Sequence, residues 1–255
     1  MKHEDLHPKI EDIIKNCKPF LTMIGNNPKY IPVRDMGNFF NEASDIVKIK
    51  TRPVRSGVKN IGTTKNIIEN TLEEYNIPSR YKHVVICSSL GKNTLFGFDA
   101  NQAAYIIPNG TFKYAYIKDD FNNGYFEYVG RIYVGIMRLL KNNNLSEYVL
   151  EFEEDFKKST INTLANVSER YTNFLLSKVD DREKIKVHDY HEQNLEIIEY
   201  IKKDYFSDDG IHTNDYRNAF SKEHEIWFTC DAYYAIPYRN SELLQKLFNA
   251  VMKST

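Results

Sequence analysis

Residues 221–236 constrain the fold of this chain most, because they begin with charged residues and end in β-branched and aromatic ones. This composition predicts a strand that is entered from a polar loop. Glu223 and Glu225 are two residues apart, so in a strand their carboxylates lie on one face, about 7 Å apart along the chain. Two such carboxylates can divide their work, one as an anionic stabiliser and the other as a base.

A second interpretation of Glu223 and Glu225 stays open. Charged side chains on the solvated face of an edge strand deter that strand from pairing with another molecule. Taken alone, the two glutamates favour this protective role, and only the residues that accompany them upstream favour the catalytic one.

Size and composition allow one large domain or two small ones, since the chain has 255 residues of which 42% are hydrophobic. The net charge of −1 gives no strong general attraction to nucleic acid or to a membrane surface. The amino-terminal residues 1–7 contain acids and no apolar core, and no apolar run is long enough to cross a bilayer. Three widely spaced cysteines predict a reducing compartment, so we expect a cytoplasmic protein.

The amino-terminal part has the spacing of helices. Apolar residues recur at helical intervals over 5–24, and residues 36–43 fit a second short helix. We therefore expect residues 1–44 to form a helical segment that packs on one main domain over residues 45–255.

An alternating strand over residues 45–55 carries Arg52 near its end, followed by Pro53. Proline lacks an N–H and suits a strand end or a sheet edge. The planar guanidinium of an arginine in that place matches a phosphate in a bidentate way, although Arg52 by itself favours the simpler explanation of a surface arginine in an ion pair.

A buried strand from His83 runs into Ser88 and Ser89. The two hydroxyls could cap a following helix, or they could hold a neighbouring acid or the ribose of a ligand. The next residues, 101–105, look helical, and 105–117 fit two strands around a Pro-Asn-Gly turn.

Helical periodicity dominates much of the remaining chain. His188 and His191 invite a metal hypothesis, but no third ligand stands at a recognisable spacing, so we expect surface residues and no metal. Helices are predicted over residues 67–75, 124–144, 145–178 (one or two), 195–200 and 241–252.

Together, Arg52, the Cys87-Ser88-Ser89 strand and the Glu223-His224-Glu225 strand stand in an order that resembles the mono-ADP-ribosyltransferases of the Arg–Ser–Glu-x-Glu class. The same segments also resemble uncharacterised phage-encoded proteins. The resemblance spans residues 45–238 and rests on three short motifs. It implies an α+β fold with a split antiparallel β-sheet core flanked by helices.

The resemblance also implies roles for the residues of the motifs. Arg52 would hold the phosphates of NAD, and Ser88, helped by Ser89, would order the nicotinamide–ribose site. Glu225 would hydrogen-bond the ribose and stabilise the oxocarbenium-like transition state, while Glu223 would orient or deprotonate the acceptor.

Aromatic side chains would complete such a site. Tyr105 or Phe112 would stack on the nicotinamide, and the polar loop over residues 206–220 would contact the acceptor through Tyr216 or Phe220.

Two positions depart from the family pattern. Cys87 stands where the family has its first hydroxyl, which leaves open whether Ser88 or Ser89 is the catalytic serine. Arg55 competes with Arg52, and because residues three apart in a strand point to opposite faces, only one of them can serve. We favour Arg52, which follows the alternating run directly.

The leading hypothesis is an NAD-dependent enzyme that transfers ADP-ribose to a macromolecular acceptor, either protein or nucleic acid. A toxin of this kind would have an antitoxin or regulatory partner and no membrane partner. The alternative is a non-catalytic structural or interaction protein, of phage origin, that keeps the fold. An RNA-binding or nuclease-like protein ranks last, because the sequence has no basic patch or nucleic-acid motif.

Overall fold

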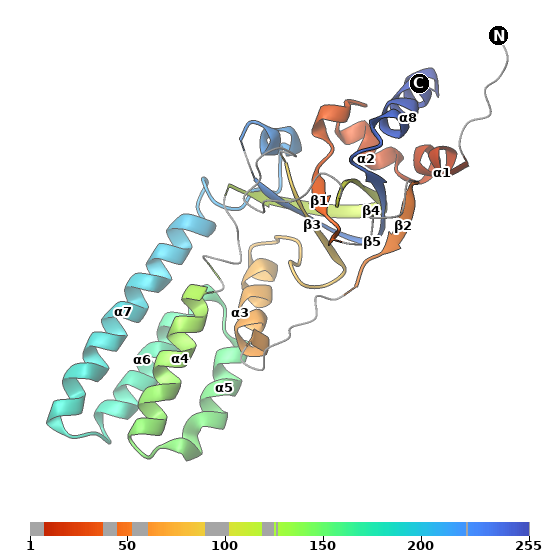
Figure 1. The fold of residues 1–255 in the computed structure, drawn as a ribbon. Coiled ribbons are helices and arrows are strands. Elements are labelled where there is room, and N and C mark those ends of the chain that lie inside the picture. Colours follow the sequence, from red (N-terminus) through yellow and green to blue (C-terminus); the bar gives the residue numbers. More distant parts are fainter. Residues whose placement is uncertain are drawn as a thin grey trace, which may run out of the picture. The chain divides into compact units, whose positions relative to one another are not determined.

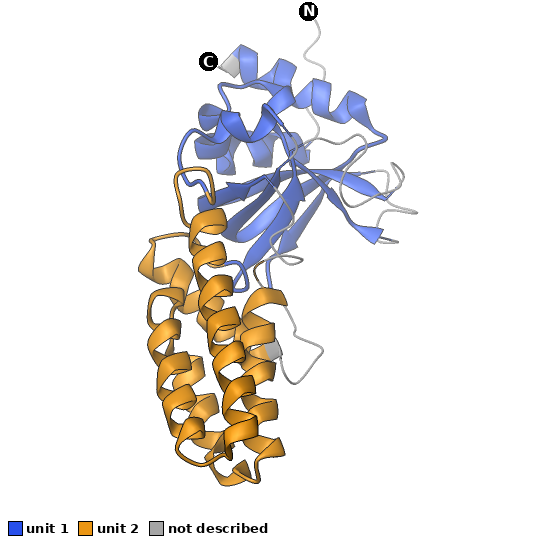
Figure 2. Ribbon diagram, turned by 90° about the vertical axis from the view of Figure 1, so that its left-hand side faces the viewer, with its two compact units in different colours: residues 1–54, 80–120, 212–255 blue, residues 55–79, 121–211 orange. Residues whose placement is uncertain are grey.

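The computed structural model describes residues 8–37, 45–52, 61–89, 102–118, 125, 127–222 and 224–254. The chain divides into two compact units, which we call the sheet unit (residues 1–54, 80–120 and 212–255) and the helical unit (residues 55–79 and 121–211) (Figure 2). Helices and antiparallel strands occur together, so the predicted α+β class is confirmed. The division differs from the expected boundary at residue 44/45, because the helical unit is inserted into the sheet unit twice.

The sheet unit is built around one long strand, β5 (Glu225–Pro237), drawn in blue in Figure 1. This strand pairs in antiparallel fashion with three others. The short strand β1 then joins β3 to β4, so that β5, β3, β1 and β4 form a closed circuit of pairings. The other strands are β1 (Val33–Asp35), β2 (Val47–Lys50), β3 (Val84–Ser88) and β4 (Ala103–Ile117).

Strands β3 and β2 pair with opposite ends of β5. The first five residues, from Glu225 to Thr229, lie opposite β3, from Ser88 back to Val84. Residues 232–235 lie opposite β2. The first half of β5 therefore lies beside β3 and the second half beside β2. This register determines which of the residues predicted for the site are close to Glu225.

Helices pack on the sheet through an apolar core (Figure 1). Phe20 lies at its centre, with its ring edge-on to Phe112, Tyr216 and Phe228 at centroid distances of 5.8–5.9 Å. The predicted amino-terminal helix is thus confirmed as a pair of helices that packs on the main fold. The helical elements of this unit are α1 (Pro8–Asn16), α2 (Lys18–Met23), η1 (Pro28–Tyr30), η5 (Tyr216–Phe220) and α8 (Ser241–Ser254).

Two local predictions in the sheet unit are wrong. Residues 103–105 belong to β4 and are not helical, and β4 continues through the expected Pro-Asn-Gly turn. A shift of register between Asn109 and Phe112 absorbs the extra residues, and Gly110 has a φ of +70°, which glycine adopts without strain. The segment therefore forms an irregular strand and no hairpin.

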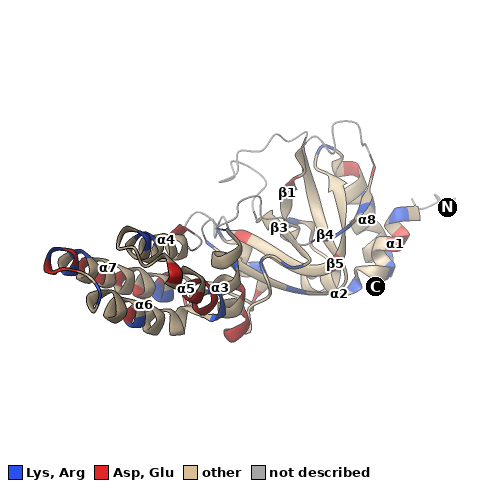
Figure 3. Cartoon of the chain, turned by 90° about the horizontal axis from the view of Figure 1, so that it is seen from below, with Lys and Arg blue, Asp and Glu red and all other residues tan. Residues whose placement is uncertain are grey.

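The helical unit contains α3 to α7. The helix ranges that the sequence predicts for α3, α4, α5 and α6 are confirmed, whereas residues 181–205 form one helix that starts well before the predicted 195–200. Asp180 begins it, because its carboxylate accepts hydrogen bonds from the N–H groups of Arg182 and Glu183. Acidic and basic side chains are interspersed along these helices (Figure 3). The elements are α3 (Ile61–Glu74), α4 (Glu127–Asn142), η4 (Ser146–Tyr148), α5 (Val149–Lys158), α6 (Ile161–Leu176) and α7 (Asp181–Tyr205).

No helix within the described ranges combines the length and the apolar character needed to cross a membrane.

The three cysteines are expected to be chemically inert in the folded protein. Cys17, Cys87 and Cys230 are all buried and free, and burial raises the pKa of the Cys17 and Cys230 thiols to about 12 and that of Cys87 further still. Because the thiolate is the reactive form, we expect negligible reaction with Ellman's reagent at neutral pH and reaction of all three thiols after denaturation in urea. Fast titration of a thiol in the native protein would contradict this placement.

Two glycines of α4 are expected to respond in opposite directions to alanine. A Cβ at Gly135 would lie 2.5 Å from Cε1 of Tyr190, whereas a Cβ at Gly130 would meet no atom within 4 Å. Gly135→Ala should therefore destabilise the helical unit by about 1–3 kcal/mol through overpacking. Gly130→Ala should stabilise it by up to about 1 kcal/mol through helix propensity. Thermal unfolding followed by circular dichroism at the helical band compares the two, and equal shifts would contradict the packing.

Candidate functional site

A buried ion pair lies at the first residue of β5. Nε of Arg80 lies 2.7 Å from Oε1 of Glu225, and the two side chains are only 2% and 1% exposed. Arg80 comes from the segment between α3 and β3. Two opposite charges that are this well shielded from water interact strongly, and removing one leaves the other buried without compensation. Among the ion pairs between described residues, it is the one in which both side chains are buried.

Ser88 lies directly opposite Glu225 in the β3–β5 ladder. Directly opposed residues have Cβ atoms about 5 Å apart and side chains on the same face of the sheet. Ser88 also pairs with Val33, so it occupies the place where β1, β3 and β5 meet. The structure thus brings together two of the residues that the sequence singled out, and adds Arg80 to them.

Ser89 has a different position from Ser88. Its N–H donates to the carbonyl of His224 (3.0 Å), and its hydroxyl both accepts from the His224 N–H (2.9 Å) and donates to the Lys222 carbonyl (3.0 Å). These bonds hold the backbone that leads into β5. Ser88 is therefore the serine that faces Glu225, while Ser89 fixes the entry of the strand.

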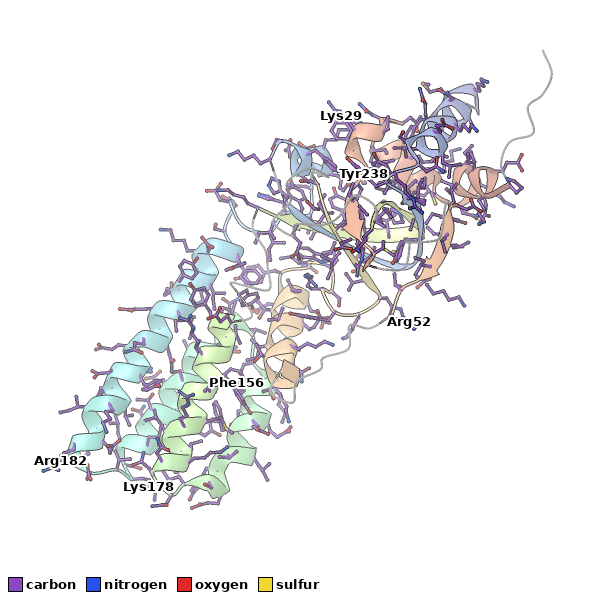
Figure 4. The ribbon with its side chains drawn as sticks, in the orientation of Figure 1. Lys29, Arg52, Phe156, Lys178, Arg182 and Tyr238 are labelled. Carbon is purple, nitrogen blue, oxygen red and sulfur yellow. The ribbon has the colours of Figure 1, made fainter. Side chains whose placement is uncertain are left out.

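Arg52 is not brought to Glu225. It is exposed and follows Thr51, whose N–H donates to the carbonyl of Asp231 (3.0 Å) and whose hydroxyl donates to that of Cys230 (Figure 4). Those carbonyls lie five and six residues along β5 from Glu225, or about 17–20 Å at the rise of a strand. The reason is the pairing of β2 with the second half of β5. Arg55 and Glu223 lie outside the described residues.

The aromatic residues expected at the nicotinamide also lie along the strands away from Glu225. Tyr105 is opposite Ile236, near the other end of β5, and its ring stacks on Tyr238 at 4.9 Å. Burial raises the pKa of Tyr105 to about 12. Phe112 is opposite Cys230 and packs in the apolar core. Neither ring lies beside the ion pair.

The two residues expected to contact an acceptor serve the core instead. Tyr216 is buried, and its hydroxyl donates to the carbonyl of Tyr30 (3.2 Å). Phe220 is half-buried and lies edge-on to Tyr30 and Tyr216 at 5.6 and 5.5 Å. The prediction for Tyr216 is wrong, because a buried ring cannot stack on a macromolecule, and Phe220 offers only part of its surface.

Three rings near the start of β5 were not predicted from the sequence to contact one another: those of Tyr116, His212 and His224. Tyr116 is opposite Ile226, the residue after Glu225, and its ring stacks on His212 at 5.1 Å and meets the edge of His224 at 5.4 Å. The backbones of Tyr116 and His212 exchange two hydrogen bonds of 2.9 Å. The two imidazoles therefore gather around Tyr116, on the face of the sheet opposite to the Glu225 side chain, because successive residues of a strand point to opposite faces.

Metal-binding chemistry finds no support in the parts of the chain that the structure describes, where no group of three or more His, Cys, Asp or Glu side chains could hold an ion. His188 and His191 both lie within α7. Nδ1 of His191 lies 3.3 Å from the Ser168 hydroxyl.

Comparisons with known proteins give no family for this chain: no protein-family model, no curated protein and no solved structure matches it. Its function is therefore inferred from Arg80, Ser88 and Glu225, together with the motifs in the sequence.

Proposed function

We propose that the protein is an NAD-dependent mono-ADP-ribosyltransferase, which cleaves the bond between nicotinamide and ribose and transfers ADP-ribose to a protein or nucleic acid. The observation that carries this proposal is the direct pairing of Ser88 with Glu225 at the junction of three strands. The resemblance requires a serine and a glutamate of this kind to act on one ribose, and opposed residues on adjacent strands meet that requirement.

Glu225 has the chemistry for the cleavage step. As nicotinamide leaves with the electron pair of the C–N bond, positive charge develops on the ribose ring. A carboxylate that is already fixed in place stabilises that charge without reorganising. The hydroxyl of Ser88 would keep the carboxylate aligned. An acceptor nucleophile then forms the new bond at the same carbon, and its proton passes to a base, the role assigned to Glu223.

Arg80 takes the part of the site arginine in this proposal. Its guanidinium is ion-paired with Glu225, and a phosphate of NAD is a second partner that suits its planar donors. Bound NAD would then engage both members of the pair, with a phosphate on Arg80 and the ribose on Glu225. Arg52 remains a predicted phosphate ligand only if NAD extends along β5, and Arg52→Ala measures that contribution.

The proposal is tested by nicotinamide release from NAD by the purified protein. Release by the wild-type protein that disappears in Glu225→Gln supports the transferase, and labelled NAD in a lysate would then identify the acceptor class.

A second candidate is a non-catalytic interaction protein that keeps the fold. It is favoured by one observation: the Glu225 carboxylate is 1% exposed and already paired with a cation. In this case the ion pair serves only to specify the fold. Absence of nicotinamide release from the wild type, with no rise in melting temperature on adding NAD, would favour this candidate over the enzyme.

A further inference from the structure

A cavity of about 610 Å³ lies within the helical unit, between α3, α4 and α7. Its volume is in the range of sites that take small molecules, about 300–1,000 Å³. Most of its lining is apolar, and a few polar groups converge on it, which is also the usual composition of such sites. The residues that matter for its chemistry are Gly130, Val134, Arg138, Tyr190, Asn194 and Ile197.

Gly130 keeps the cavity open. Gly130 is the fourth residue of α4, and a glycine within a helix costs up to about 1 kcal/mol relative to alanine. Gly135 in the same helix is explained by packing, because the Tyr190 ring occupies the place of its Cβ. Gly130 has no such neighbour within 4 Å. It leaves a flat stretch of α4 backbone that a ligand can approach closely.

Asn194 places a fixed amide at the cavity. Its side chain is only 3% exposed, and its Nδ2 donates to the Ser168 hydroxyl at 3.1 Å. That hydroxyl also lies 3.3 Å from Nδ1 of His191. A buried amide costs free energy unless it is hydrogen-bonded, and this chain of bonds holds it in one orientation. An amide held in this way can read a polar edge of a ligand.

Arg138 supplies positive charge to the cavity. It lies seven residues after Arg131, so the two arginines share a face of α4 and are about 10 Å apart along the axis. Arg131 is already engaged by Glu127, with 2.6 Å between Nη2 and Oε1. Arg138 is exposed, and among the described residues no ion pair holds it. The cavity therefore has one guanidinium that is available to an anionic group.

We propose that this cavity binds a mononucleotide. The base lies on the backbone at Gly130, between the side chains of Val134 and Ile197. Its amino edge donates to Oδ1 of the Asn194 amide, whose Nδ2 is already bonded to Ser168. The phosphate is bound by Arg138, which matches it in a bidentate way. An aliphatic anion has no donor for this Oδ1. All these residues belong to the helical unit, whereas Arg80, Ser88 and Glu225 belong to the sheet unit.

Calorimetric titration of the full chain with AMP tests the proposal, beside adenosine, inorganic phosphate and decanoate. AMP should bind, and adenosine should bind about tenfold or more weakly, since it lacks the charged contact to Arg138. Decanoate that binds while AMP does not would overturn the proposal in favour of an amphiphile site. Phosphate that binds as tightly as AMP would overturn it in favour of an anion site without base recognition.

Two variants locate the binding, with a matched control. Gly130→Leu fills the cavity and should abolish AMP binding while the helix stays folded, since the new Cβ meets no atom within 4 Å. Arg138→Gln should weaken AMP binding about tenfold and leave adenosine binding unchanged. Arg182→Gln removes the same charge near the start of α7 and should have no effect (Figure 4). AMP affinity that is unchanged in Gly130→Leu would overturn the assignment to this cavity.

Discussion

Replacing Arg80 with methionine is expected to lower the free energy of unfolding of the sheet unit by about 3–5 kcal/mol, the cost of leaving one member of a buried ion pair uncompensated. Methionine roughly preserves the length of the side chain, so the loss reflects charge more than volume. Glu225 would remain in β5 at 1% exposure without the guanidinium of Arg80. An effect of this size is a large fraction of the stability of an average domain.

Trp227 provides a selective probe for that measurement. It is the single tryptophan of the chain, it is fully buried, and it lies two residues after Glu225 in β5. Its fluorescence during urea unfolding reports on the sheet unit alone. The matched control is Lys9→Met, which breaks the exposed pair with Asp45 in the same unit and should change stability little.

A double variant separates the ion pair from other effects. Arg80→Met combined with Glu225→Leu removes both charges, and apolar replacement of a buried pair is often close to neutral. We therefore expect the double variant to be more stable than Arg80→Met alone. A double variant that loses the sum of the two single losses would show that the residues do not act as a pair.

Replacing Glu225 with glutamine is expected to slow nicotinamide release by about a hundredfold to a thousandfold, the usual effect of removing one group that stabilises transition-state charge. Glutamine keeps the shape of the side chain and an oxygen that can accept from Arg80. It removes the negative charge that the ribose cation needs. The rate is measured by separating nicotinamide from NAD at saturating NAD.

The control for Glu225→Gln is Asp231→Asn, which makes the same chemical change at an exposed position of the same strand. It should leave the rate unchanged. Because Glu225 is buried and ion-paired, the fluorescence of Trp227 must first establish that each variant is folded. A folded Glu225→Gln protein that releases nicotinamide at the wild-type rate would remove Glu225 from the reaction.

Ser88→Ala tests the same site with less risk to the fold. The change leaves the ion pair of Glu225 with Arg80 intact and removes only the hydroxyl opposite the carboxylate. A reduced rate with unchanged unfolding would assign Ser88 to positioning Glu225, and an equal loss for Ser89→Ala would contradict the distinction between the two serines.

The sequence predicts the strands of this fold best where polar and apolar residues follow a clear pattern. The strand that starts at Glu225 and the strand that ends at Ser88 are both confirmed, whereas their direct pairing is visible only in the structure. Strand β1 (Val33–Asp35) has only three residues, too few to show the alternation of apolar and polar side chains that marks a strand. The sequence therefore places these residues in the helical segment 1–44. Pro108 suggested a turn, but a change of register lets β4 continue past it.

Arg80 was missed because nothing near it in the sequence points to its partner. It stands in a polar connection before β3, and Glu225 is 145 residues further along the chain. Arg52 was favoured instead, since it directly follows an alternating run. Which end of β5 each strand meets is a property of the whole sheet, and local patterns carry no information on it.

The position of β5 in the chain also sets the order in which the protein can assemble on the ribosome. This strand pairs with β2, β3 and β4, yet it is synthesised after all of them and after the last helix of the inserted unit. The helical unit has its full complement of residues once residue 211 has been made, before any residue of β5 is synthesised. Strands β2, β3 and β4 cannot complete their pairing until β5 has been synthesised. A nascent chain therefore passes through a stage at which the helical unit can fold while the sheet unit is still incomplete.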